Sequence, residues 1–496
     1  MDAGRTVPDI LVKQITDDSR AVRPGALFVA VKGTKMDGHR FVDQAVKQGA
    51  AAVLLEEEIT VPAPAVKLRV KRTQPILGPL AHAFFGSPSQ RLKVVGITGT
   101  NGKTTVAWLT QHLLQSIGLP CGLIGTICYR VGTSERSSTN TTPGAIALQE
   151  MLAEMKNQGL KACAMEVSSH ALDQHRTDGI HWAAGVFTNL SPEHLDYHQT
   201  VDQYLHAKLR LFEMLSPQAA AVINRESPVW ERVRAVTRGR VVTYGFREPA
   251  DVAAEEIRCS MEGTSCRLRT PEGKFSVRWN LVGRHNVENL LAALGAVSGL
   301  GIPLKEIIPG VERFPGVPGR LERIEAGQSF PVFVDYAHTD GALRSVLEQL
   351  RAVTTRKILV VFGCGGDRDR TKRPRMGRVA AELAHRVIVT SDNPRSEDPA
   401  AIADEVVAGI PKSFKQWEIL LDRREAIKAA LESADENWLV LIAGKGHETG
   451  QILKDQVIPF DDRQIVLESL RAKRSNPVFK SEIATAPSGP RDDDAR

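Results

Sequence analysis

Short apolar runs alternate with helix-like segments along most of the chain. In the middle part, strands are predicted by the runs at 93–99, 121–126, 162–169, 185–190 and 220–224. A later set, at 331–337, 357–364, 386–392 and 438–446, is separated by helical stretches such as 341–351. Such alternation is typical of parallel sheets with crossover helices. The pattern predicts an α/β protein whose later set of strands forms a Rossmann-like domain.

Turn-rich segments divide this pattern into three predicted domains. A Gly-Ser-Pro-Ser break at 86–89 ends a small α/β unit with apolar runs at 26–31 and 50–56, and a Pro/Gly cluster at 314–319 ends the middle part. The predicted domains are 1–88, 89–315 and 316–474, which suits a chain of 496 residues at about 150 residues per domain. The tail 475–496 is polar and contains prolines, so it is predicted to be disordered.

Composition and charge narrow the classes of function. The net charge of +6 is spread without a basic segment, which gives little support for nucleic-acid binding and suits a phosphorylated, carboxylate-rich small substrate. The chain has no signal-peptide pattern and no apolar run of ~18 residues, so membrane insertion is not expected. Six cysteines without CxxC spacing favour a reducing compartment. We therefore expect a cytoplasmic protein.

The segment from Val94 to Thr105, VVGITGTNGKTT, has the order strand, glycine-rich turn, helix. In this order, backbone N–H groups at the start of a helix surround phosphate oxygens. Lys103 would reach the β- and γ-phosphates, and the Thr104 hydroxyl would contact Mg²⁺. The general P-loop pattern expects glycine where Ile97 stands, so an ordinary P-loop NTPase is a poor match. The segment nevertheless predicts ATP binding.

Three further segments carry candidate chemistry, each with an alternative. Thr141 and Thr142 precede a helix and could face an anion or simply cap that helix. Glu166 ends a strand, where a carboxylate can hold Mg²⁺, but it could equally be a buried structural residue. His194 and His198 are four residues apart, yet no third ligand at metal spacing supports zinc. Lys208, taken by itself, fits a solvated charge on a helix.

Ten motifs in order reveal a family. The chain contains GTNGKTT, TNTTPG, MEVSSHAL, NLSPEHLDYH, LVGRHNVENLLAA, PGRLERI, VDYAHT, GCGGDRDRTKRP, SDNPR and AGKGHE. Over residues 10 to 470 this series resembles the Mur ligases, and it is most similar to the members that add diaminopimelate.

The resemblance implies a peptide-bond-forming reaction in peptidoglycan precursor synthesis. ATP would phosphorylate the D-Glu γ-carboxylate of UDP-N-acetylmuramoyl-L-alanyl-D-glutamate, and an amine of meso-2,6-diaminopimelate would attack the acyl phosphate. Such chemistry depends on positioning and charge neutralisation in a water-poor site. The enzyme is expected to act as a monomer. The alternatives are a lysine-adding relative, a folylpolyglutamate synthase-like ligase, and a nucleotide-binding protein without activity.

The resemblance also implies roles for individual residues. The catalytic group would be Lys103, His194, Lys208 and His338. ATP would contact Gly99, Thr100, Asn101, Gly102, Lys103, Thr104, Thr105, Asn286 and Arg320, the last on domain closure. Two Mg²⁺ ions would be held by Thr104, Glu166, His194 and Lys208, the lysine as a CO₂-derived carbamate, because an ammonium would repel the metal. The UDP-muramoyl dipeptide would contact Ser19, Thr34, Lys35, Met36, Asn140, Thr141, Thr142, Ser168, Gln174 and Arg176.

The acceptor amino acid would be recognised by Arg368, Asp392, Asn393, Pro394, Arg395, Gly444 and Glu448. Asp392 to Arg395, DNPR, matches the motif of the diaminopimelate-adding enzymes. Diaminopimelate has a distal carboxylate that Arg395 and Arg368 could clamp, whereas lysine has none and would leave the arginines unpaired. At one place the chain departs from the family: Asp340 and Gly341 follow Thr339 where Pro-Asp is common, which is expected to free the backbone locally.

Overall fold

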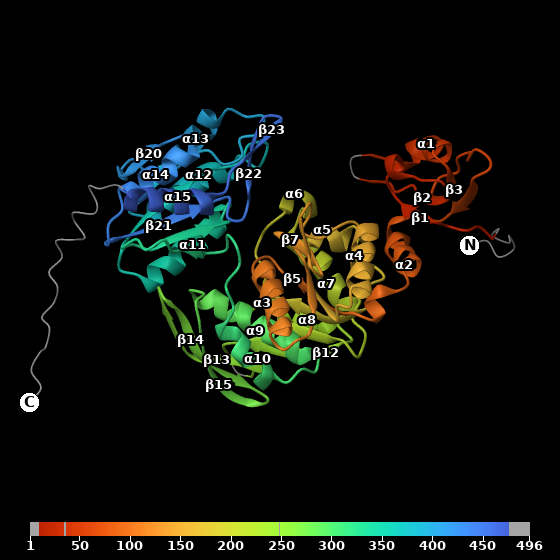
Figure 1. The fold of residues 1–496 in the computed structure, drawn as a ribbon, viewed down its shortest axis with the longest axis horizontal. Helices are drawn as coiled ribbons and strands as arrows, with labels where there is room; N and C mark the ends of the chain where they lie inside the picture. Colours follow the sequence, from red (N-terminus) through yellow and green to blue (C-terminus); the bar gives the residue numbers. More distant parts are fainter. Residues whose placement is uncertain (1–8, 34–35, 248, 476–496) are drawn as a thin grey trace, which may run out of the picture. The chain divides into compact units, whose positions relative to one another are not determined.

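The computed structural model describes residues 9–33, 36–247 and 249–475. The tail predicted to be disordered, 475–496, lies outside these residues except for Ser475. The chain forms two compact units (Figure 1). The first comprises residues up to 258 with 265–279 and 285–314, and the second comprises 259–264, 280–284 and the residues from 315 onward. Each unit is built on parallel sheets covered by helices, which confirms the predicted α/β class.

The first sheet is small and parallel, in the order β1-β2-β3-β4. Its helices cover opposite faces: Val42 and Ala45 of the first helix pack on Phe28 and Val53, and the second helix packs on the other side. The strands are β1 (Gln14–Thr16), β2 (Ala26–Val29), β3 (Ala50–Leu55) and β4 (Val66–Arg69), and the helices are α1 (Val42–Lys47) and α2 (Gln74–Phe84).

The second sheet has eleven strands in the order β15-β14-β13-β12-β11-β10-β5-β9-β6-β7-β8. The strands are β5 (Lys93–Thr98), β6 (Cys121–Ile124), β7 (Cys128–Val131), β8 (Ser134–Ser137), β9 (Ala162–Glu166), β10 (Trp182–Phe187), β11 (Ala220–Asn224), β12 (Arg240–Gly245), β13 (Val252–Ser260), β14 (Gly263–Thr270) and β15 (Gly273–Trp279). The helices are α3 (Lys103–Ser116), α4 (Ala145–Asn157), α5 (Ser169–Asp173), α6 (Leu195–His198), α7 (Val201–Glu213), α8 (Trp230–Val236), α9 (Arg284–Gly299) and α10 (Leu304–Glu312).

The middle of this sheet is parallel, as predicted, but its edges are not. Strands β9, β5, β10, β11 and β12 pair in parallel, whereas β7 is antiparallel to both β6 and β8. A two-residue connection joins β7 to β8. Connections of the same length join β13 to β14 and β14 to β15. Such connections are too short for a crossover helix, so they give hairpins rather than βαβ units. The predicted parallel sheet is therefore confirmed for the middle strands, whereas the hairpins at the edges were not predicted.

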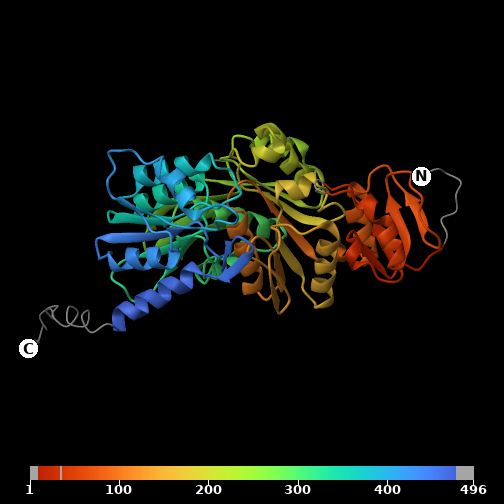
Figure 2. The ribbon, with the colours of Figure 1, turned by 90° about the horizontal axis from the view of Figure 1, so that it is seen from above.

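The third sheet, in the second unit, has the order β16-β17-β21-β18-β19-β20. Among the described pairs, β16 is antiparallel to β17 and the other neighbours are parallel. Alternate residues face opposite sides: Val360 packs with α11, α12 and α13, and Val361 packs with α14 and α15. Figure 2 shows α15 as a long helix along this domain. The elements are β16 (Glu322–Ile324), β17 (Val332–Asp335), α11 (Asp340–Val353), β18 (Lys357–Phe362), α12 (Lys372–Leu383), β19 (Arg386–Val389), α13 (Pro399–Val407), β20 (Trp417–Ile419), α14 (Arg423–Glu432), β21 (Trp438–Ala443), the hairpin β22 (Gly450–Leu453) and β23 (Gln456–Pro459), and α15 (Asp462–Ser475).

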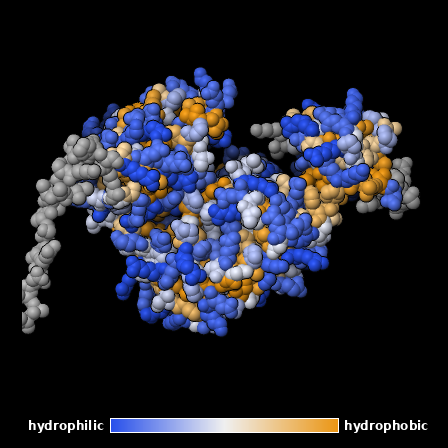
Figure 3. Space-filling model, in the orientation of Figure 1, coloured by the Kyte–Doolittle hydropathy of each residue, from blue (hydrophilic) through white to orange (hydrophobic). Residues whose placement is uncertain are grey.

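The surface in Figure 3 is mainly hydrophilic, with hydrophobic residues in small groups. Within the part of the chain that the structure describes, no helix has the length and apolarity to cross a bilayer.

Candidate active site

The glycine-rich loop follows the carboxyl end of β5, which lies between β9 and β10. Gly99 has φ +143° and Gly102 has φ +87°, both in the region that side chains avoid. A Cβ at Gly99 would lie 1.9 Å from Thr188 Oγ1, and one at Gly102 would lie 2.4 Å from Asn289 Oδ1. Both positions therefore require glycine, and α3 begins directly after them at Lys103.

The loop is held in place by the segment that follows β10. The Thr100 N–H donates to the Asn189 carbonyl at 2.9 Å, and the Asn101 N–H donates to Asn189 Oδ1 at 2.9 Å. Thr188 Oγ1 donates to the Asn101 carbonyl at 2.6 Å. These bonds fix the turn before any ligand binds, while Thr105 is buried in the first turn of α3.

Two lysines converge on the loop. Lys103 Nζ donates to the carbonyl oxygens of Gly99 at 3.0 Å and Thr100 at 2.7 Å, and Lys208 Nζ, from α7, donates to Gly99 O at 2.7 Å. Lys208 is buried, and its ammonium lies 4.2 Å from the centre of the Tyr204 ring. Burial, together with the positive charge of Lys103, lowers the pKa of Lys208 well below its ordinary value. The interpretation of Lys208 as a solvated charge was therefore wrong.

Glu166 ends β9 as a buried carboxylate beside the loop. Its Oε2 accepts from Thr104 Oγ1 at 2.9 Å and from Thr126 Oγ1 at 3.0 Å, and its Oε1 accepts from the Thr126 N–H at 2.7 Å. The predicted neighbours Thr104 and Glu166 are thus in direct contact.

His194 has φ +56° and precedes α6. Its ring centroid lies 4.9 Å from that of His170 and 6.1 Å from that of Tyr204, and its pKa is lowered mainly by burial. His198, in contrast, is buried with Nε2 3.0 Å from Ser169 Oγ, so the two histidines of this segment have different surroundings.

The residues expected at the muramoyl dipeptide gather beyond Glu166. Thr142 Oγ1 donates to the Glu166 carbonyl at 2.8 Å and accepts from the Ser168 N–H at 3.0 Å. Arg176 donates from Nη1 to the Thr142 carbonyl at 3.1 Å and from Nε to Gln174 Oε1 at 3.0 Å.

The other residues of this predicted group also have partners. Thr141 Oγ1 lies 3.0 Å from Thr126 Oγ1, and the Asn140 carbonyl accepts from the Tyr129 hydroxyl. Ser168 caps α5.

The two other groups expected in the first unit are the uridine-side residues and Asn286. Ser19 is buried with Oγ 3.3 Å from Gln44 Oε1, whereas Met36 is 68% exposed. Thr34 and Lys35 lie outside the described residues. Asn286 is buried in α9, where its Oδ1 accepts from Asn289 Nδ2 at 3.2 Å.

In the second unit, Arg320 and His338 flank Tyr336. The Arg320 guanidinium lies 4.8 Å from the centre of the Tyr336 ring, and His338 Nδ1 lies 2.8 Å from the Tyr336 carbonyl. Burial lowers the pKa of His338. Thr339 Oγ1 accepts from the Ala342 N–H at 3.2 Å and α11 begins at Asp340, so the departure from the family motif retains a regular capped helix instead of freeing the backbone.

The DNPR segment follows β19. Asn393 Nδ2 donates to Glu448 Oε2 at 2.9 Å, and a Cβ at Gly444 would lie 2.6 Å from Asp392 Oδ2. The backbone of Arg395, at φ +52°, pairs with the hairpin: its N–H donates to the Ile452 carbonyl at 3.1 Å. Arg395 Nη1 donates to the Gly366 carbonyl at 2.8 Å.

Arg395 and Arg368 are near the same glycine. A Cβ at Gly365 would lie 2.8 Å from Arg395 Nη1 and 3.9 Å from Arg368 Cγ. The Pro394 carbonyl faces Gly366 across the same loop, where a Cβ would lie 1.9 Å away. The predicted acceptor-binding residues are therefore brought together within the second unit.

Sequence reasoning missed four residues of these networks: Thr126, Tyr204, Asn289 and Lys445. Asn289 and Lys445 lie inside motifs that were recognised, so motif membership was the available signal.

 Both stand three positions from a predicted residue, Asn289 after Asn286 and Lys445 before Glu448. Thr126 and Tyr204 gave no such signal, because their roles arise from contacts with Glu166 and Lys208 that only the fold creates.

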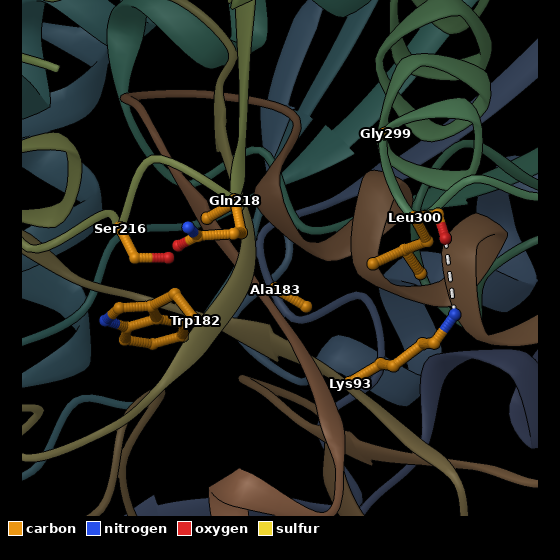
Figure 4. A pocket seen from close by; sticks show the side chains of 8 residues that line it. Lys93, Trp182, Ala183, Ser216, Gln218, Gly299 and Leu300 are labelled. Atoms are coloured by element: carbon orange, nitrogen blue, oxygen red, sulfur yellow. Dashed lines mark hydrogen bonds between the residues drawn. The ribbon is translucent and has the colours of Figure 1, made fainter. Parts of the chain in front are cut away.

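A separate cavity of about 260 Å³ opens at the amino ends of β5 and β10. Figure 4 shows Trp182, Ser216 and Gln218 on one side of it and Lys93 and Leu300 on the other, with the Lys93 ammonium 3.2 Å from the Leu300 carbonyl. The glycine-rich loop follows the opposite, carboxyl end of β5, and the residues lining the cavity include none of the predicted site residues.

The glycine-rich turn lies between a parallel strand and the start of a helix, beside a buried carboxylate and two lysines. This arrangement is typical of α/β proteins that bind phosphate groups. Three family models match the chain: "Mur ligase family, catalytic domain" at 11–85, "Mur ligase middle domain" at 97–297, and "Mur ligase, glutamate ligase domain" at 319–446. The chain belongs to the Mur ligase family.

Individual relatives agree with this family. The UDP-N-acetylmuramoyl-L-alanyl-D-glutamate–2,6-diaminopimelate ligase of Listeria innocua is 43% identical over 466 residues, 93% of this chain and 94% of that protein. The enzyme of the same name from Bacillus cereus is 43% identical over 471 residues, 94% of this chain and 95% of that protein. A solved structure of a ligase with this name has a TM-score of 0.70 at 33% identity and covers 96% of this chain and 97% of its own.

Proposed function

We propose that this protein is an ATP-dependent ligase that joins meso-2,6-diaminopimelate to the D-Glu γ-carboxylate of UDP-N-acetylmuramoyl-L-alanyl-D-glutamate. The carboxylate attacks the γ-phosphate of ATP, ADP leaves, and an amine of diaminopimelate then displaces phosphate from the acyl phosphate. The names of the relatives support this substrate pair, since they cover nearly the whole chain at 42–43% identity. The enzyme would work as a cytoplasmic monomer, with domains at 1–88, 89–315 and 316–474.

The glycine-rich loop supplies the phosphate-binding part of this mechanism. The N–H groups of Gly99 to Thr105 would surround the phosphates, and Lys103 would leave its carbonyl partners to neutralise charge on the transferring group. Asn286 would contact the base, and Arg320 would also contact the nucleotide.

The donor set beside the loop fits magnesium. Glu166 is a buried carboxylate bonded to the Thr104 hydroxyl, and oxygen donors of this kind are the ligands that Mg²⁺ prefers. Thr104, Glu166, His194 and Lys208 would hold two ions, with Lys208 as a carbamate. Bound magnesium would neutralise negative charge on the phosphates. Burial lowers the pKa of Lys208 and so favours the neutral amine, the form that can react with CO₂, which supports the carbamate.

The remaining first-unit residues would hold the muramoyl dipeptide. Thr141, Thr142, Ser168, Gln174 and Arg176 share one hydrogen-bonded network with Glu166, which supports a place for the D-Glu end of that substrate beside the phosphates. The uridine end would contact Ser19 and the segment that includes Thr34, Lys35 and Met36, with Asn140 contributing nearby.

One observation carries the choice of diaminopimelate: Arg395 and Arg368 both lie beside Gly365. The Arg395 guanidinium and the aliphatic stem of Arg368 meet at this glycine. Two arginines on one loop suit a carboxylate, which diaminopimelate has at its distal end and lysine lacks. A pocket built for that group would reject lysine by a factor on the order of 10⁴. A folylpolyglutamate synthase-like reaction would need neither the DNPR segment nor the N-terminal domain.

Phosphate release tests the proposal. The purified protein is supplied with ATP, Mg²⁺ and UDP-N-acetylmuramoyl-L-alanyl-D-glutamate, and either meso-diaminopimelate or L-lysine. Turnover with diaminopimelate alone is expected. Turnover with lysine instead would keep the ligase chemistry and overturn the role of the two arginines, and no turnover with either would contradict the proposed function.

A further inference from the structure

Lys445 is a buried lysine in the loop that follows β21. It stands between Gly444, at φ +115°, and Gly446, at φ +52°. A Cβ at Gly446 would lie 2.6 Å from the Gly319 carbonyl oxygen, so the tight turn requires glycine. The turn directs the side chain of Lys445 to the interior, where its ammonium has no exposed surface.

The ammonium of Lys445 closes a three-membered network. It donates to Asn393 Oδ1 at 3.1 Å and to Glu448 Oε2 at 2.9 Å, and Asn393 Nδ2 donates to the same Glu448 oxygen at 2.9 Å. The Ile452 N–H also donates to Asn393 Oδ1, at 2.9 Å. Two donors on one side and a carboxylate on the other fix the orientation of the Asn393 amide.

In this network Glu448 uses only one of its two carboxylate oxygens. Oε2 accepts two hydrogen bonds, whereas Oε1 accepts none from the residues that the structure describes. The Glu448 side chain is 31% exposed, while its lysine partner is fully buried. A carboxylate held in this way can accept one ammonium group from outside without moving.

We propose that Lys445 is a positioning residue that selects the distal amine of the acceptor amino acid by holding Glu448 and Asn393. This inference rests on the proposed function, in which Glu448 belongs to the acceptor site. It adds that the Glu448 carboxylate takes the distal amine and that Lys445 holds this carboxylate in place. Without Lys445, Glu448 would lose its strongest partner, and its carboxylate could rotate toward solvent or protein dipoles.

The test compares Lys445→Met with Lys428→Met. Lys428 forms the same kind of pair, 2.8 Å from Glu425 three residues away, but on the exposed surface of α14. For Lys445→Met, the KM for meso-diaminopimelate should rise about 10- to 100-fold, the effect of losing a charge-assisted hydrogen bond. The KM for ATP should stay within about twofold of wild type, and Lys428→Met should change neither.

A second acceptor separates positioning from general damage. L-2-Aminopimelate keeps both carboxylates and one amine but lacks the distal amine. Lys445→Met should weaken turnover of diaminopimelate and leave turnover of 2-aminopimelate unchanged, so the preference of the enzyme between them should narrow about 10-fold or more. An equal loss with both acceptors, or an unchanged KM for diaminopimelate, would overturn the inference.

A variant without either charge covers the case in which Lys445→Met does not fold. Lys445→Met/Glu448→Gln contains no unpaired buried charge, and its KM for diaminopimelate should equal that of Glu448→Gln alone. A clearly higher KM in the double variant would contradict a role exerted through Glu448. If the wild-type enzyme itself neither binds nor turns over diaminopimelate, the proposed function fails and the inference fails with it.

Discussion

Lys103 and Lys208 donate hydrogen bonds to the same acceptor, the carbonyl oxygen of Gly99, at 3.0 and 2.7 Å. Two ammonium groups on one carbonyl repel each other, and one of them, Lys208, is fully enclosed. Burial and the positive charge of Lys103 both lower the pKa of Lys208, which shifts its equilibrium toward the neutral amine. A neutral amine is also the form that reacts with CO₂.

The first prediction is that Lys208 carries a carbamate in solution. Wild-type protein in ¹³C-bicarbonate should give a carbamate signal in its ¹³C NMR spectrum, because the neutral amine adds CO₂ with loss of one proton. Lys208→Met should lack that signal, and Lys428→Met, which removes an exposed lysine, should retain it. A signal of equal intensity in Lys208→Met would assign it to another amine and contradict the prediction.

The second prediction separates backbone strain from steric contact in the glycine-rich loop. Gly102→Ala would place a Cβ 2.4 Å from Asn289 Oδ1, so ADP affinity should fall more than about 10-fold, since α3 cannot begin without moving Asn289. Gly118→Ala has a similar left-handed backbone, φ +76°, but its Cβ has no atom within 4 Å. It should cost about 1 kcal/mol of stability and leave ADP affinity unchanged. Calorimetric titration with ADP measures the affinity of each variant. Equal ADP affinities of Gly102→Ala and Gly118→Ala would contradict the steric argument.

Hydrophobic pattern predicted the interior of the fold better than its margins. Most parallel strands of the middle and C-terminal sheets were found within a few residues, as with 220–224 and β11, but β12 and β13 were not predicted. Several predicted runs extend beyond the carboxyl end of the strand: 162–169 continues three residues past Glu166. These small and polar extensions are the loops that carry the site. Short edge strands such as β7 and β8 were missed because a run of four residues is too short to show a clear hydrophobic pattern.

The candidate site shows the same division. Motifs identified Lys103, Glu166 and Asn393 as residue types, but they could not show that Thr104 contacts Glu166 or that Lys208 is buried. Thr104 and Glu166 are separated by 62 positions in the sequence, and Lys208 and its partner Gly99 by 109 positions. Only the fold brings such residues together. Lys445 illustrates the limit most clearly, because a lysine between two glycines predicts a solvated turn, whereas the fold encloses it.

The third prediction concerns the acceptor end of the site. Arg395→Ala should raise the KM for diaminopimelate about 100-fold or more and leave the KM for ATP nearly unchanged, because a bidentate contact to the distal carboxylate is lost. Arg395→Lys keeps the charge without the planar fork and should recover only part of the affinity. Arg424→Ala, which removes an exposed arginine paired with Glu468, serves as the control. Steady-state kinetics with each substrate varied gives the answer, and equal effects on both KM values would remove the clamp.

The fourth prediction is a pH dependence of stability that originates at Glu397. Both its oxygens accept from the buried guanidinium of Arg373, at 2.8 and 2.9 Å, and Oε1 also accepts from the Asp367 N–H at 2.6 Å. These bonds lower the pKa of Glu397 from 4.5 to about 2. The unfolded chain therefore binds more protons than the folded one between these values, so the stabilisation is complete above about pH 4.5 and is lost as the pH falls toward about 2.

Glu397→Gln should consequently be less stable than wild type by about 1–2 kcal/mol at pH 7, a moderate value because the side chain is partly exposed. The difference should shrink steadily as the pH is lowered from 5 to 3.5, since wild type loses the same interaction by protonation. Glu425→Gln, at an exposed pair on α14, should differ from wild type by less than about 0.5 kcal/mol throughout. Thermal unfolding of the three proteins across this pH range makes the comparison. A Glu397→Gln difference that does not change with pH would assign the effect to packing rather than to the charge of Glu397.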